Sequence, residues 1–142
     1  QALARMHLAW LESNGWRPTL LCVADADSTF AQSVSDLGIP NRSVESVTLE
    51  EAREVIRSYD FLISGRFHLT ILAWLSGVPT VCLDSNSWKT RGLLEAVGSP
   101  NGPAASLESM KQWIAAGPFL PDEERLERQR RLALLNGRSR SL

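Results

Sequence analysis

The sequence predicts an α/β domain in which a mostly parallel sheet carries helices on both faces. Short apolar runs alternate with amphipathic segments along the chain. The apolar runs are continuous, which is typical of strands that are covered on both faces. The connections are short, which favours right-handed strand–helix–strand units. At 142 residues, 44% of them hydrophobic, the chain is long enough to bury one core.

Composition excludes several classes of protein. The formal net charge of −1 gives no global field that would favour nucleic acid or an anionic membrane as a partner. The longest helical apolar run, residues 69–75, is far shorter than the ~20 residues of a membrane span. Cys22 and Cys82 both lie in apolar runs, so we expect buried free thiols in a reducing compartment. His7 and His68 have no metal-ligand spacing, and we expect no metal site.

The first third of the chain predicts a helix, a strand and a second helix. Residues 2–13 form an amphipathic helix whose apolar face comprises Leu3, Met6, Trp10 and Leu11. His7 borders this face and is expected to be structural. Residues 19–24 form a buried strand, and the helix that follows runs to about Leu37 with Asp27 as its N-cap. Residues 42–47 predict a short edge strand.

The middle of the chain predicts two further strands, each followed by a helix. Thr48 and Glu51 match a capping box, and the helix that they open buries Leu49, Ala52, Val55, Ile56 and Tyr59. Residues 61–64 form a strand that turns at Gly65 into a helix that is apolar nearly all round. Residues 80–83 form the next strand. Ser87 is expected to cap a helix that turns Leu93, Leu94 and Val97 inward.

The last third predicts a helix over residues 104–116 and a charged helix that starts with Pro121 at its first position and ends near Leu135. We expect the tail after that helix to fray. The predicted division is therefore an α/β domain over residues 1–120, followed by a charged helix and tail over residues 121–142.

Polar residues gather where three predicted strands end, at residues 25–28, at residues 64–68 and at residues 84–89. Ligands of parallel sheets bind at these carboxyl ends. Arg66 and His68 fall in the first turn of the predicted helix, whose free N–H groups and dipole favour anions. The sequence therefore predicts a phosphate or carboxylate pocket.

Simpler roles compete with this interpretation. Arg66 would merely cap a carbonyl, His68 would be a satisfied core histidine, Asp25 would cap a helix, and Lys89 would be a solvated cation at a helix start.

The chain has no Gly-x-Gly-x-x-Gly run, no P-loop and no Gly-x-Ser-x-Gly elbow. An arginine for binding, a histidine for proton transfer and a second cation suit transfer from or to a phosphorylated small molecule.

The segment Ile63-Ser-Gly-Arg-Phe-His68, followed by Ile71-Leu-Ala73 and Gly77-Val-Pro79, resembles the C-terminal half of the polysaccharide pyruvyl transferase family. The similarity covers about residues 59–98 and continues less sharply through Lys89-Thr-Arg-Gly-Leu-Leu94 and Gly98.

The resemblance implies a glycosyltransferase-B-like protein with two Rossmann-like domains, of which this chain is similar to the second. Its reaction would transfer pyruvyl from phosphoenolpyruvate to a sugar of a surface polysaccharide, with no cofactor besides that donor. Arg66 would bind the phosphate or carboxylate of the donor. His68 would contact the donor or act as general acid at its enol carbon.

The full set of predicted substrate-binding residues, from the strand ends and the resemblance together, is Ser64, Gly65, Arg66, His68, Lys89, Asp25 and Asp84, and we expect no metal. The loop before Lys89 is longer than the family pattern, so the role of Lys89 stays open.

Two alternatives remain at this stage. A glycosyltransferase domain would bind a nucleotide sugar, with Asp25 or Asp84 on its ribose. A non-catalytic relative would serve assembly through its charged last helix. Because the chain starts at Gln1 inside a helix, we expect an excised domain that lacks its N-terminal partner domain and is inactive alone. The expected location is the cytoplasm, at the inner face of the membrane, and homo-oligomerisation stays open.

Overall fold

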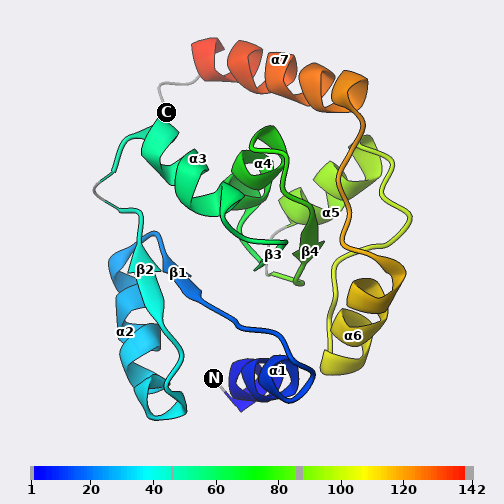
Figure 1. The fold of residues 1–142 in the computed structure, drawn as a ribbon. Coiled ribbons are helices and arrows are strands. Elements are labelled where there is room, and N and C mark those ends of the chain that lie inside the picture. The colour runs from blue at the N-terminus through cyan, green and yellow to red at the C-terminus, as the bar shows by residue number, and fades with distance from the viewer. Residues whose placement is uncertain (1, 46, 86–87, 140–142) are drawn as a thin grey trace. The chain divides into compact units, whose positions relative to one another are not determined.

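The computed structural model describes residues 2–45, 47–85 and 88–139. The chain forms two compact units, Gln1–Ala52 and Arg53–Leu142, and each is described by itself (Figure 1). The division into an α/β domain over residues 1–120 and a charged helix and tail over residues 121–142 stays a prediction.

The described part of the first unit contains a parallel strand pair and the helical segments around it. Its elements are α1 (Ala2–Ser13), β1 (Leu20–Cys22), α2 (Asp25–Ser33), the 3-10 turn η1 (Ser35–Leu37) and β2 (Asn41–Ser43). Strand β1 runs parallel to β2, with Leu20 opposite Asn41 and Cys22 opposite Ser43. The core comprises Leu8, Val34 and Ile39, with Leu20, Phe30 and Leu37 against them.

Two expectations for the first unit are wrong. The buried face of α1 includes Leu8 and Leu11, whereas Met6 is 53% exposed. Asp27 is not an N-cap, because α2 already begins at Asp25. The Asp27 carboxylate instead accepts hydrogen bonds from the backbone N–H groups of Val23 (2.9 Å) and Ala24 (3.1 Å). It therefore ties the helix back to the end of β1.

The second unit contains the other parallel strand pair. Helix α3 (Leu49–Arg57) begins just before the unit boundary, and the elements after it are β3 (Leu62–Ser64), α4 (Phe67–Leu75), β4 (Thr80–Cys82), α5 (Trp88–Ala96), α6 (Leu107–Ala116) and α7 (Glu123–Ser139). Strand β3 runs parallel to β4, with Leu62 opposite Thr80 and Ser64 opposite Cys82. The α/β class is confirmed, and the sheets within the described ranges are small, with two strands each.

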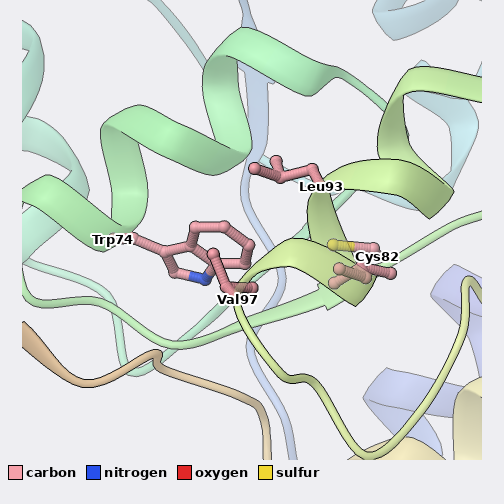
Figure 2. Close-up of a cluster of buried hydrophobic side chains, with 5 residues drawn as sticks. Trp74, Cys82, Leu93 and Val97 are labelled. Carbon is pink, nitrogen blue, oxygen red and sulfur yellow. The ribbon is translucent and has the colours of Figure 1, made fainter. Parts of the chain in front are cut away.

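A hydrophobic cluster holds β4 against the neighbouring helices. Its buried members are Trp74, Cys82, Leu93, Leu94 and Val97, with Phe67, Ile71, Phe119 and Leu126 packed around them. Figure 2 shows Trp74 of α4 reaching towards Val97, which directly follows α5. The Trp74 Nε1–H donates to Thr80 Oγ1 at 3.0 Å and to the Phe119 carbonyl at 3.2 Å. The cluster therefore fixes α4 and α5, the two helices that follow β3 and β4.

The helix starts are partly as predicted. Thr48 Oγ1 accepts the Glu51 N–H at 3.2 Å, which confirms the N-cap of α3, but Leu49 is 68% exposed and does not join the buried stripe. Pro121 is not the first residue of α7. Asp122 precedes the helix, and its Oδ1 accepts the Arg125 N–H at 2.8 Å.

Helix α6 starts later than residue 104, because Ala104 pairs with Leu83 as an isolated parallel bridge. Ser106 then serves as N-cap, with its Oγ accepting the Ser109 N–H at 3.1 Å. Helix α7 extends to Ser139, so the predicted helix end near Leu135 is wrong. Ser87 and residues 140–142 of the tail lie outside the described residues.

We expect Gly98→Ala to lower the free energy of unfolding by about 1–2 kcal/mol, since Gly98 has a φ of 72° that disfavours a side chain. A Cβ there would also overlap the Arg125 guanidinium, which donates to the Val97 carbonyl at 3.1 Å. Denaturant unfolding measures the change. The matched control is Gly92→Ala, within α5 at a glycine of ordinary φ. Equal losses in both variants would contradict this account.

Candidate functional site

The candidate site lies where β3 and β4 end side by side. The Leu83 N–H donates to the Ser64 carbonyl at 2.9 Å, which joins the two chain segments just beyond the strands. A Cβ placed on Gly65 would lie 3.8 Å from Leu83 Cβ and 4.0 Å from Ser85 Cβ. Gly65 and the start of the loop after β4 are therefore neighbours.

Ser64 shapes the turn from β3 into α4. Its side chain is buried, and its Oγ accepts the Arg66 N–H at 2.9 Å. Arg66 consequently adopts an extended conformation (φ −98°, ψ 124°) and is the N-cap of α4 rather than a member of its first turn. The Arg66 carbonyl accepts from the N–H (3.1 Å) and the Oγ1–H (2.9 Å) of buried Thr70. The turn thus fixes the backbone from which the arginine side chain extends.

Arg66 and His68 are both exposed. The interpretation of His68 as a core histidine is therefore wrong. Its ring meets the Phe67 ring edge-on at 5.3 Å between centroids, while Phe67 packs against the hydrophobic cluster of the second unit. A guanidinium and an imidazole are thus held two residues apart, accessible to a ligand, at the positive end of the α4 dipole.

The loop after β4 supplies the second side of the site. Asp84 is exposed, and its N–H donates to the Ala104 carbonyl at 2.8 Å. Ser85 was not predicted. Its Oγ is buried and has no hydrogen-bond partner within the described ranges. Trp88, 80% exposed at the start of α5, was also missed. A polar loop at a strand end was the available signal for both.

The remaining predicted residues lie outside this turn in the chain. Lys89 is exposed on α5. Asp25 opens α2 in the first unit, and its side chain lies outside the described residues. His7, on α1, is half-buried, and desolvation lowers its pKa. Lys89 and Asp25 therefore stay predictions.

The described residues give little support to metal binding, to a nucleophilic cysteine or to a membrane-spanning helix. Among the described residues, no group of three or more His, Cys, Asp or Glu side chains is placed to hold a metal ion. Cys82 is buried in the hydrophobic cluster, where desolvation raises the pKa of its thiol and disfavours a nucleophilic thiolate. No helix of the described residues has the length and apolar character to cross a membrane.

The family model of polysaccharide pyruvyl transferase matches residues 26–87. The family resemblance is confirmed. The matched stretch contains the whole turn from Ser64 to His68, together with Asp84 and Ser85, whereas Asp25 and Lys89 fall outside it. No curated protein and no solved structure gives a significant match to the chain. The match to this family indicates a transferase of polysaccharide biosynthesis, with a carbohydrate as acceptor.

Proposed function

We propose that this chain is the C-terminal, donor-side domain of a polysaccharide pyruvyl transferase with a glycosyltransferase-B-like architecture. It would transfer pyruvyl from phosphoenolpyruvate to a sugar of a surface polysaccharide. The observation that carries this proposal is the pair of exposed side chains, Arg66 and His68, at the start of α4 and inside the family match.

The anionic donor suits this position. Phosphoenolpyruvate carries a phosphate and a carboxylate on three carbons. A guanidinium binds either group with two parallel hydrogen bonds. The N–H groups of the first turn of α4 add donors that have no partner within the helix. Arg66 would therefore hold one anionic group of the donor in front of the helix.

His68 would supply the proton that the reaction requires. Addition of a proton to the methylene carbon of phosphoenolpyruvate makes the adjacent carbon electrophilic, and one sugar hydroxyl attacks it. A second hydroxyl of the same sugar then displaces inorganic phosphate and closes a ketal. A histidine beside the donor can act as the general acid of the first step.

The acceptor contacts would come from an N-terminal domain of the same protein, so the isolated chain would bind the donor without turnover. The protein would act in the cytoplasm at the inner face of the membrane, with no cofactor besides its donor. Homo-oligomerisation and a role for Lys89 or Asp25 in binding are further parts of this proposal.

Calorimetric titration of the protein with phosphoenolpyruvate and, separately, with UDP-glucose tests the proposal. We expect binding of phosphoenolpyruvate only. Binding of UDP-glucose alone would favour a glycosyltransferase, with exposed Asp84 available to the ribose. Absence of binding to both compounds would favour a non-catalytic role in assembly.

A further inference from the structure

Ser85 has an unexplained hydroxyl group. Its Oγ is buried without a hydrogen-bond partner in the described part of the chain, although the side chain as a whole is only half-buried. A buried polar atom that lacks a partner destabilises a fold, which makes such atoms rare. Rotation about χ1 alone re-aims a serine oxygen. An acceptor beside Ser85 could therefore recruit this hydroxyl without a change in the backbone.

Gly65 is the neighbour of Ser85, and the fold does not explain why a glycine occupies this position. It does not have the positive φ that favours glycine. A Cβ at Gly65 would make ordinary contacts, at 3.8 Å from Leu83 and 4.0 Å from Ser85. Alanine would fit this backbone, and it would reduce the entropy that the unfolded chain loses on folding.

The two observations point to the same place. A glycine that the backbone does not require faces a serine whose hydroxyl has no partner, at the joined ends of β3 and β4. Each residue makes the fold less stable than alanine would. Local choices that oppose stability gather at functional sites. Arg66 follows Gly65 directly, so this place adjoins the residue that carries the exposed guanidinium.

We propose that Gly65 and Ser85 form the floor of the donor site. Gly65 leaves room for the donor to approach the backbone, and the Ser85 hydroxyl donates a hydrogen bond to a phosphate or carboxylate oxygen of the donor. This inference rests on the proposed function and adds Ser85 to its binding residues.

The experiment measures thermal unfolding and calorimetric binding of phosphoenolpyruvate for Ser85→Ala and Gly65→Ala. We expect each variant to unfold at the same or a higher temperature than the wild type. We expect each to bind phosphoenolpyruvate about tenfold more weakly or worse, because a hydrogen bond to a charged group is lost or the approach is blocked. Competition by inorganic phosphate or by pyruvate identifies which anionic group Ser85 contacts.

Two control variants match the changes in chemistry. Thr90→Val removes another buried hydroxyl that has no partner in the described ranges, at a residue of α5 that is 1% exposed. Gly92→Ala replaces another glycine of ordinary φ, in the same helix. We expect both controls to bind phosphoenolpyruvate like the wild type.

Three results would overturn the inference. Wild-type affinity in Ser85→Ala and Gly65→Ala would remove both residues from the site while leaving the proposed function intact. A lower unfolding temperature of Ser85→Ala would show a structural hydroxyl. Failure of the wild-type protein to bind phosphoenolpyruvate would overturn the proposed function and this inference together.

Discussion

Arg66→Ala is expected to weaken phosphoenolpyruvate binding by about tenfold or more. One hydrogen bond to a charged group contributes about 1.5–3 kcal/mol, and a guanidinium can make two to one phosphate or carboxylate. The side chain is exposed, and the turn depends on the Arg66 backbone, whose N–H donates to Ser64 Oγ at 2.9 Å. The substitution therefore removes the guanidinium while the backbone of Arg66 keeps its hydrogen bond to Ser64.

Calorimetric titration at fixed ionic strength measures this change. Arg66→Lys keeps the positive charge but loses the planar fork, so its affinity is expected to fall between those of the wild type and the alanine variant. Arg128→Ala is the charge-matched control, since Arg128 is exposed on α7 and pairs with Glu124 at 3.6 Å. An affinity that is unchanged in Arg66→Ala, or lowered equally in Arg128→Ala, would contradict direct binding by Arg66.

The fold class could be predicted because burial leaves a pattern in the sequence. Continuous apolar runs predicted the strands, and both Cys22 and Cys82 are buried where those runs predicted them. The capping role of Thr48 could also be predicted, since Thr48 and Glu51, whose N–H its hydroxyl accepts, are three residues apart. Such signals are local and need no knowledge of the tertiary structure.

Errors arose where several residues could perform the same role. Asp27 and Pro121 are good residues for a helix start, yet the α2 helix begins two residues earlier and Asp122 caps α7. The apolar face of α1 is rotated away from Met6, because the helix packs Leu8 against Val34 and Ile39. Tertiary packing decides between such alternatives, and sequence spacing does not record it.

The candidate site could likewise be predicted only where its residues are close together in the sequence. A motif of adjacent residues brings Ser64, Gly65, Arg66 and His68 together, and its neighbours in sequence are also neighbours in space. Ser85 is 20 positions from Gly65 in the chain, and only the pairing of β3 with β4 places the two side by side. An unpartnered hydroxyl is a property of the folded environment, so the polar loop over residues 84–89 indicated the place but not the role of Ser85.

His68→Gln is expected to reduce turnover at saturating phosphoenolpyruvate by about 100-fold or more. General acid catalysis contributes about 10²- to 10⁴-fold, and an amide cannot supply the proton at neutral pH. The fold is expected to tolerate the change, because His68 is exposed and its described ring contact is the edge-on one with Phe67. Release of inorganic phosphate by the protein that carries both domains, in the presence of the sugar acceptor, reports the turnover.

The binding measurement separates proton transfer from simple attachment of the donor. If His68 acts as general acid, His68→Gln keeps nearly wild-type affinity for phosphoenolpyruvate, because the amide still offers a hydrogen-bond donor and Arg66 still binds an anionic group. His7→Gln changes the other histidine of the chain, which lies on α1, and is expected to turn over like the wild type. Lost affinity in His68→Gln, together with normal turnover at saturation, would contradict proton transfer and make His68 a binding residue. In the proposed scheme Arg66 governs the affinity for the donor and His68 governs the rate, although both extend from the first residues of the same helix.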